Sequence, residues 1–376
     1  MNVSTKKTKK TIQDRSGKKQ LGNGLTSREG VLFIIMLVAM AVLSTQNKNF
    51  LSTSNLLNQV RLLTEVGLVA LPMTFIIITG GIDLSVGSIV GLCAIMLGYS
   101  WQEWGLPLPI AIVICLVVGA LAGFVNGLLI VRVKVPPLIM TLATLAFYRG
   151  LAEGISRGRS ARGYPEWFYQ MGQGDFLCIP TPRWGMDWTF QGMNWTFQGM
   201  DWTFQGMDWT FQWTWCGEPA PTQIWLLLIF TVLAGIVLGR TTLGRTLYAI
   251  GNNEIGARFS GLPVNRNLLI IYTFSGLMSA LAAYIFVSRV STTRSDMGSG
   301  LELDVIAAVV LGGTSIFGGS GSIAGTMIGV VLIQLLKNGL ALSGVASDAT
   351  IVVVGGVLVL SILINNFIQD RKNATL

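Results

Sequence analysis

The sequence contains no histidine among its 376 residues. Histidine is the commonest general base, proton shuttle and metal ligand, so its absence weighs against most acid–base and metal chemistry. No pair among the four cysteines has the spacing of a metal site, and Cys93 and Cys115 fall in apolar runs, as core residues do. No nucleophile–base set is recognisable either. We therefore expect no catalytic residues, no metal and no other cofactor, and hence a protein that is not an enzyme.

Charged residues are scarce as well. They make up 12% of the chain, about half the share of an ordinary soluble domain, whereas hydrophobic residues make up 51%. The net charge of +8 is concentrated near the start, because eight of the 26 basic residues precede Glu29. These eight are Lys6, Lys7, Lys9, Lys10, Arg15, Lys18, Lys19 and Arg28. We interpret residues 1–30 as a basic, disordered cytoplasmic tail of a membrane protein, with no nucleic-acid partner.

Long apolar runs predict the fold class, an all-α polytopic membrane protein. A spanning helix needs about 20 mostly apolar residues. Ten runs approach that length: 31–46, 60–80, 85–104, 107–131, 135–154, 224–239, 267–289, 302–318, 321–343 and 349–368. An even number of crossings returns the C-terminus to the cytoplasm. The same threading places Arg132, Lys134, Arg240 and Arg245 inside, as the positive-inside rule requires.

This topology divides the chain into two membrane halves. Residues 31–154 form the first half, and residues 155–223 form a long external loop. Residues 224–368 form the second half, which contains a polar cytoplasmic segment at 239–266. Residues 369–376 are a second cytoplasmic tail.

Paired glycines predict breaks within these helices. The chain has 45 glycines, and Gly80-Gly81 opens the segment Gly80–Ser88 between two apolar runs. Small residues let membrane helices pack closely, and they also permit a helix to break where protein or water satisfies the freed backbone groups. We expect such a break here.

The same segment holds a carboxylate, Asp83, and a charge inside a membrane costs about 2.5–3.5 kcal/mol on insertion scales. Asp83 either caps the following helix by accepting N–H bonds from its first turn, or lines a polar path through the membrane with Ser85 and Ser88. Glu302 and Asp304 stand at the start of a later apolar run in the same manner, so they join the candidate path. The two sites, one in each half, also suit an inverted five-helix repeat.

Residues 185–212 are four near-identical heptads, Gly-Met-Asp-Trp-Thr-Phe-Gln, with Asn194 replacing Asp in the second copy. Apolar residues at every second position favour a strand over a coiled coil. The simplest interpretation is a tandem duplication in a tolerant external loop. The alternative is a tryptophan-rich surface that stacks on sugars. Cys178 and Cys216 flank the repeats and would close the loop if they formed a disulfide.

The polar segment 239–266 can form a short amphipathic helix from Glu254 to Phe259, ended by Ser260–Pro263. On the cytoplasmic face it would suit docking to a soluble partner, and an ordinary connecting loop is the alternative. Its first residues, Gly239–Thr246, imitate a nucleotide-binding loop. Arginine replaces the required lysine, however, and an apolar helix rather than a strand precedes it. The chain therefore shows no means of hydrolysing ATP itself.

Three long motifs carry a family resemblance. They are Gly-Gly-Ile-Asp-Leu-Ser-Val-Gly-Ser at 80–88, Leu-Tyr-Ala-Ile-Gly-Asn-Asn at 247–253 and Ala-Ala-Val-Val-Leu-Gly-Gly-Thr-Ser-Ile-Phe-Gly-Gly-Ser-Gly-Ser at 307–322. They resemble the permeases of ABC importers for ribose, xylose, arabinose, rhamnose and autoinducer-2. The resemblance runs from about residue 31 to residue 368, apart from the heptads.

The resemblance implies a multi-pass permease of the bacterial inner membrane that dimerises with a second copy or a paralogue. It implies cytoplasmic ATP-binding subunits, a periplasmic solute-binding protein and lipid as partners. It also makes 251–261 a coupling helix for the ATPase, with candidate contacts at Asn252, Glu254, Ala257, Arg258 and Gly261. The expected function is import of a monosaccharide or an autoinducer-2-like solute. The rival interpretation is an ion- or proton-coupled secondary transporter that uses Asp83 or Glu302 as its ion site.

Overall fold

A computed structural model describes residues 28–346, apart from positions 48, 179–180, 187–202, 205–206 and 215–218, together with positions 349–350, 352–353 and 355–356. Residues 1–27 of the first predicted tail, the second tail, most of the apolar run 349–368 and most of the heptads lie outside the described residues. Residues 28–30 are helical, so the predicted boundary of the first tail is wrong by three residues.

The described chain is dominated by helices. In order, the helices are α2 (Arg28–Gln46), α3 (Thr53–Ile78), α4 (Val86–Gln102), α5 (Leu108–Arg132), α6 (Pro137–Ser156), α7 (Glu166–Tyr169), α8 (Thr222–Arg240), α9 (Thr242–Asn252), α10 (Glu254–Phe259), α11 (Val264–Val290), α12 (Leu301–Leu311) and α13 (Ile323–Leu342). Within the described residues, short strands occur only between α7 and α8: β1 (Asp175–Cys178), β2 (Thr181–Met186), β3 (Thr203–Phe204), β4 (Met207–Thr214) and β5 (Pro219–Pro221). The helical fold class is therefore as predicted.

Six of these helices are long and apolar enough to cross a membrane: α3, α5, α6, α8, α11 and α13. Two shorter apolar helices, Leu32–Gln46 and Val86–Gln102, fall below that length. A multi-pass helical protein is thus confirmed, whereas ten spans and an inverted repeat stay predictions.

Two of the predicted spans have different bounds in the structure. The span expected at 302–318 is wrong beyond Leu311, where α12 ends, and Gly313, Gly318 and Gly319 all adopt positive φ angles near +80°. At Gly312 a Cβ atom would lie 2.5 Å from the carbonyl oxygen of Gly325, so α12 and α13 pack too closely for a larger residue. The span expected at 60–80 begins earlier, at Thr53, because the side chain of Ser52 caps the N-terminus of α3.

The break predicted at Gly80–Ser88 is present. Helix α3 ends at Ile78 and α4 begins at Val86, so the chain between them is not helical. Gly80 has a φ of +79°, a conformation that residues with a Cβ atom rarely adopt. The paired glycines therefore mark the end of α3.

The described part of the repeat region forms antiparallel strands. β2 pairs with β4 over six residue pairs, from Thr181 opposite Thr214 to Met186 opposite Trp209, and β3 pairs with the start of β4. The strand preference inferred from the alternating heptads is confirmed for these residues. Cys178 ends β1, and Cys216 lies outside the described residues, so the disulfide stays a prediction.

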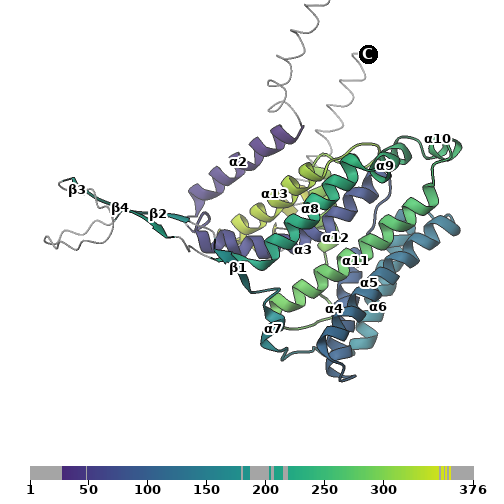
Figure 1. Ribbon diagram of the computed structural model, residues 1–376, viewed down its shortest axis with the longest axis horizontal. Coiled ribbons are helices and arrows are strands. Elements are labelled where there is room, and N and C mark those ends of the chain that lie inside the picture. Colours follow the sequence, from purple (N-terminus) through teal and green to yellow (C-terminus); the bar gives the residue numbers. More distant parts are fainter. Residues whose placement is uncertain are drawn as a thin grey trace, which may run out of the picture.

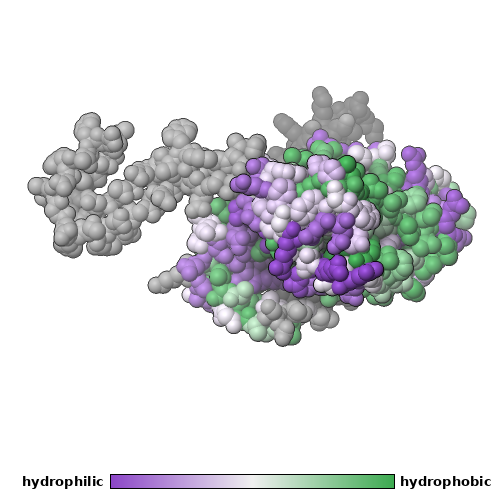
Figure 2. Space-filling view, turned by 90° about the horizontal axis from the view of Figure 1, so that it is seen from below, coloured by the Kyte–Doolittle hydropathy of each residue, from purple (hydrophilic) through white to green (hydrophobic). Residues whose placement is uncertain are grey.

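Burial divides the helices into a centre and a flank. In α3, 83% of the most apolar 18-residue stretch is buried inside the protein, against 22% in α6 and in α8. The exposed faces of α5, α6 and α8 carry large apolar side chains such as Val113, Phe147 and Ile229. In Figure 2, hydrophilic residues gather on part of the visible surface, and hydrophobic residues border them. Exposed apolar helix flanks of this kind suit a lipid environment.

Glycines bring α5 and α11 into backbone contact at the centre. A Cβ atom at Gly123 would lie 2.2 Å from the carbonyl oxygen of Tyr272, and one at Gly276 would lie 2.1 Å from that of Gly119. Neither distance leaves room for a methyl group. This is the small-residue packing expected between membrane helices.

The long helices define two ends of the bundle (Figure 1). Helices α9 and α10 lie at one end, beside the start of α11, and we name it the α10 end. Helix α7 lies at the other, beside the end of α11, and we name it the α7 end. Functional residues occur at both ends and at the break in between.

Candidate functional site

The break between α3 and α4 holds a buried carboxylate. Asp83 is fully buried, and its Oδ1 accepts hydrogen bonds from Ser85 N–H at 3.0 Å and Ser85 Oγ at 2.6 Å. Its Oδ2 accepts a hydrogen bond from Ser275 Oγ of α11 at 3.1 Å. Ser85 immediately precedes α4, whose N-terminus has no side-chain cap. Asp83 therefore closes the turn that leads into α4 and attaches that turn to α11.

Further polar side chains extend this network to α5 and α6. Asn126 Nδ2 donates to Ser85 Oγ at 2.8 Å, and Tyr148 Oη donates to Asn126 Oδ1 at 3.2 Å. Ser88, in the first turn of α4, donates to the carbonyl of Ser85, which precedes the helix. No basic side chain hydrogen-bonds to Asp83 in the part of the chain that the structure describes. Among the described residues, two hydroxyl groups and one backbone N–H donate to the carboxylate, and Asn126 supports it through Ser85, which suits a structural joint between four helices.

Helix α10 has the bounds that the sequence predicted, Glu254–Phe259. The side chain of Asn253 caps it by accepting the N–H of Gly256 at 2.8 Å. Arg258 forms an ion pair with Glu254 at 2.7 Å and donates to Asn265 Oδ1 at 2.8 Å, which fixes α10 against the start of α11. These polar contacts hold a very short helix in place.

The two faces of α10 differ. Ala257 is buried and packs with Ile250 and Val264, whereas Ile255 is 68% exposed and Phe259 is 89% exposed. Gly261 follows the helix with a φ of +76°, which turns the chain back towards α11. Helix α10 thus anchors one small side chain and presents two large apolar side chains to its surroundings.

Contacts connect the α10 end to both glycine-rich breaks. The N–H of Gly319 donates to the carbonyl of Ile78, the last residue of α3, at 2.8 Å. Tyr248 Oη of α9 donates to the carbonyl of Gly321 at 2.7 Å, and burial raises the pKa of Tyr248, so that its hydroxyl remains a donor. A Cβ atom at Gly251 would lie 1.8 Å from the carbonyl oxygen of Ile78. Helix α9 therefore packs directly on the end of α3 and on the loop after α12.

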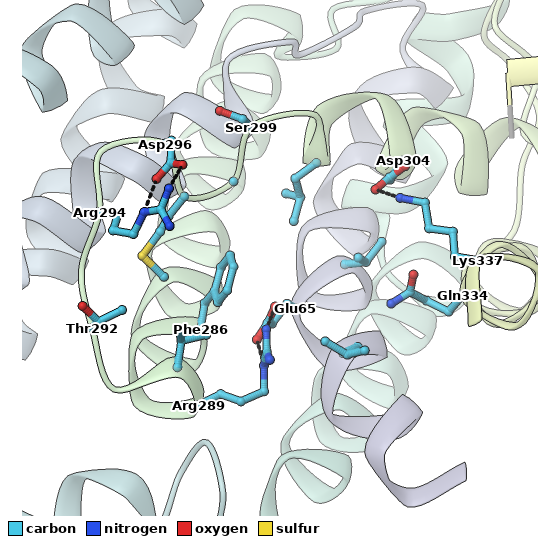
Figure 3. Close-up of a pocket in the computed structure, with 16 residues that line it drawn as sticks. Glu65, Phe286, Arg289, Thr292, Arg294, Asp296, Ser299, Asp304, Gln334 and Lys337 are labelled. Carbon is cyan, nitrogen blue, oxygen red and sulfur yellow. Dashed lines mark hydrogen bonds and ion pairs between the residues drawn. The ribbon is translucent and has the colours of Figure 1, made fainter. Parts of the chain in front are cut away.

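A cavity of about 410 Å³ lies towards the α7 end, between α3, α11, α12, α13 and the loop that follows α11 (Figure 3). Its wall carries three ion pairs: Glu65–Arg289, Asp304–Lys337 and Arg294–Asp296. Arg289 donates to both carboxylate oxygens of Glu65, at 2.6 Å and 3.1 Å. We name this space the paired-charge cavity.

Glu302 does not line the paired-charge cavity, although it stands two residues before Asp304. It lies in the first turn of α12 and approaches Gly87 of α4 closely. A Cβ atom at Gly87 would lie only 2.0 Å from Glu302 Oε2. Nearby, Arg149 of α6 donates to the carbonyls of Ser295 at 2.6 Å and Met297 at 3.0 Å. Arg149 therefore holds the loop between α11 and α12 in place.

The structure thus separates the predicted path residues. It brings Asp83, Ser85 and Ser88 together at the break, and it places Asp304 in the wall of the paired-charge cavity, beside none of the three. Sequence reasoning missed Glu65, Arg149, Arg289 and Lys337, although each is a charge within or at the end of a predicted apolar run. That position was the available signal, because a charge in a membrane helix needs a partner or a polar cavity.

Comparison with known proteins agrees with this architecture. The chain is 36% identical over 332 residues to the autoinducer 2 import system permease protein LsrD of Escherichia coli (strain K12), covering 88% of this chain and 89% of the relative. It is 37% identical over 344 residues to the ribose import permease protein RbsC of Bacillus subtilis (strain 168), covering 91% and 92%. No solved structure matches it significantly.

The family described as branched-chain amino acid transport system / permease component matches residues 55–362. These bounds include every candidate site residue named above and exclude the basic tail. With its apolar helices and its import-permease relatives, the chain therefore belongs to this family and is a membrane permease, not an enzyme.

Proposed function

We propose that the chain is the translocating subunit of an ABC importer that carries a monosaccharide or an autoinducer-2-like solute into the cytoplasm. An ATP-binding subunit and a solute-binding protein are its partners, as membership of the permease family implies. The single observation that carries the proposal is the pair of exposed apolar side chains on α10, Ile255 and Phe259, on a helix anchored to the bundle through Ala257.

In this proposal, the α10 end faces the cytoplasm and the α7 end faces outward, with both termini inside. Arg132, Arg240 and Arg258 lie in or beside the elements of the α10 end, in agreement with the positive-inside rule. The chain then crosses the membrane ten times, with α4 and α12 as short helices that complete two of the crossings. Two such interrupted helices, one in each half, support an inverted five-helix repeat.

Helix α10 acts as the coupling helix. Asn253 caps it and the Glu254–Arg258 ion pair stabilises it, while Asn252 at the end of α9 is a further candidate contact. Ile255 and Phe259 enter a groove on the ATPase. A movement of α10 passes to α9, which packs on the carbonyl of Ile78 and hydrogen-bonds to the loop after α12. The glycine-rich breaks at both places allow α3 and α12 to be displaced without bending a continuous helix.

The exposed apolar flanks support dimerisation in lipid. Helices α5, α6 and α8 carry more large apolar side chains on their exposed faces than a single water-soluble chain can present. A second copy or a paralogue covers part of this surface, and lipid covers the rest. The loop between α7 and α8 faces the solute-binding protein, and a Cys178–Cys216 disulfide would restrain it.

The test is reconstitution of the permease with its ATP-binding subunit and solute-binding protein in liposomes. We expect uptake of labelled solute to require ATP and both partners, and to be unaffected by ionophores. Uptake driven by an ion gradient without ATP would refute the proposal in favour of a secondary transporter, an alternative that the comparisons do not support. Alanine at both Ile255 and Phe259 should abolish uptake while the permease still inserts and dimerises.

A further inference from the structure

The paired-charge cavity has no net charge. It is lined by three carboxylates and three cations, which form three ion pairs: Glu65 of α3 with Arg289 of α11, Asp304 of α12 with Lys337 of α13, and Asp296 with Arg294 within the loop that follows α11. The side chains of Glu65 and Arg289 are 7% and 22% exposed, and those of Asp304 and Lys337 are 21% and 30% exposed. These pairs therefore keep part of their polar surface open towards the cavity.

Apolar side chains line part of the cavity. Phe286 lies beside Arg289, with the guanidinium carbon 5.1 Å from the ring centroid, and Leu62 and Val290 also line the cavity. Figure 3 shows the side chains of Phe286, Arg289 and Glu65 on one side, with Asp304, Lys337 and Gln334 on the other. A cavity lined by aromatic and aliphatic side chains together with carboxylate, amide and ammonium groups matches a molecule with C–H surfaces and a rim of hydroxyl groups.

We propose that this cavity is a solute-binding site of the permease itself, and that it selects neutral polyhydroxylated solutes over anions and zwitterions. The proposal rests on the function proposed above, and it assigns part of the selectivity to the permease as well as to the solute-binding protein. A volume of about 410 Å³ lies within the usual range for small-molecule sites and is ample for a single monosaccharide.

Charge balance gives this selectivity. A hydroxyl group both donates and accepts hydrogen bonds, so it can bridge Asp304 and Lys337 without separating them. An anion must compete with Asp304 for Lys337, and a zwitterion must open one pair to reach both charges. Each opened pair leaves a partly buried charge without its partner, which is costly.

Protection of a single cysteine tests the proposal. Ser299 is exposed and lines the cavity, so Ser299→Cys in the full-length permease in liposomes should react with a neutral, membrane-impermeant maleimide. We expect ribose to slow the labelling at millimolar concentration, and ribose 5-phosphate and leucine to leave it unchanged. Wild-type protein measures the background from the native cysteines.

A matched control lies in a second cavity towards the α7 end. Ser160 is exposed and lines this space of about 440 Å³ between α4 and α6, together with Glu103 and Arg159. Ser160→Cys should label at a similar rate, and ribose should not protect it. Protection at both positions would show a nonspecific effect of the sugar and would overturn the assignment.

A charge change gives a second arm. Asp304→Asn in the Ser299→Cys background leaves Lys337 without its carboxylate, so ribose 5-phosphate should now protect, at a concentration roughly tenfold below that needed without the change, since a hydrogen bond to a charged group corresponds to about this factor. Asp304→Asn combined with Lys337→Gln should remove the gain. Equal protection by phosphate and sugar in all variants would refute selection by charge balance.

The outcomes separate the two proposals. If Ser299→Cys supports ATP-dependent uptake and ribose gives no protection, the cavity is not a solute site and the function proposed above stands. If ribose protects Ser299→Cys and uptake does not depend on ATP, the site stands and the importer function falls.

Discussion

Replacement of Asp83 gives a sharp test of the network at the break. In Asp83→Asn, the amide oxygen can accept both hydrogen bonds from Ser85, and the amide nitrogen can donate to Ser275, whose hydroxyl then accepts instead of donating. No basic side chain loses an ion-pair partner among the described residues. We therefore expect the free energy of unfolding to change by less than about 1 kcal/mol, since asparagine and aspartate are equivalent at such turns.

Asp83→Ala should lower the free energy of unfolding much more than Asp83→Asn does. It leaves the buried N–H of Ser85 without an acceptor, which costs about 1–3 kcal/mol, whereas the hydroxyls of Ser85 and Ser275 can rotate towards other acceptors and add less. The measurement is the thermal stability of each variant after purification in the same detergent, together with the rate of ATP-dependent uptake per inserted permease. Because Asp83 does not line the paired-charge cavity, Asp83→Asn should retain at least half of the wild-type uptake rate.

Two results would refute this reasoning. Equal destabilisation by Asn and Ala would mean that the charge of Asp83, rather than its capacity to accept hydrogen bonds, stabilises the break. Loss of uptake in Asp83→Asn at a normal protein level and normal stability would return Asp83 to the solute path, the alternative that the sequence left open.

Three further predictions concern other elements. Ala257→Trp should abolish the stimulation of ATPase activity with insertion retained, because a buried small side chain beside Ile250 holds α10 in place; normal stimulation would refute the coupling role. Deletion of 185–212 should leave uptake near wild type, since the entropy of loop closure varies only with the logarithm of length; lost uptake at normal expression would favour the tryptophan surface that stacks on sugars. Gly276→Val should prevent folding, because the new Cβ atom would lie 2.1 Å from the carbonyl oxygen of Gly119. Ile229→Val, at an exposed position, should leave folding unchanged, and fluorescence-monitored gel filtration distinguishes the two variants.

Local features of the structure could be read from the sequence. The bounds of α10 follow from an Asn cap and a Gly-Leu-Pro ending, and the break before α4 follows from Gly80-Gly81 beside a carboxylate. The alternation of Trp, Phe and Met in the heptads predicts a strand. The residues Met207–Gln212 of the last heptad do form part of the strand β4. Each of these signals depends on residues within a few positions of one another, where cap, turn and side-chain periodicity rules apply.

The paired-charge cavity could not be found in this way. Glu65 and Arg289 are separated by 224 positions in the sequence, and Asp304 and Lys337 by 33. Only the packing of α3 on α11 and of α12 on α13 brings each pair together. The sequence shows four isolated charges in apolar surroundings, and it does not show which carboxylate meets which cation. For the same reason, the contact of α9 with Ile78 and Gly319 was not predicted.

The matched charges of the cavity have an electrical consequence. Moving one elementary charge across a membrane potential of 100 mV changes the free energy by about 2.3 kcal/mol. Two ion pairs of the cavity join helices, the third lies within the loop after α11, and any pair that moves as a unit carries no net charge through the field. A neutral solute adds none. If the cavity binds a neutral solute as proposed, binding and release there move no net charge, so the affinity of this site should be the same in a polarised and in a depolarised membrane.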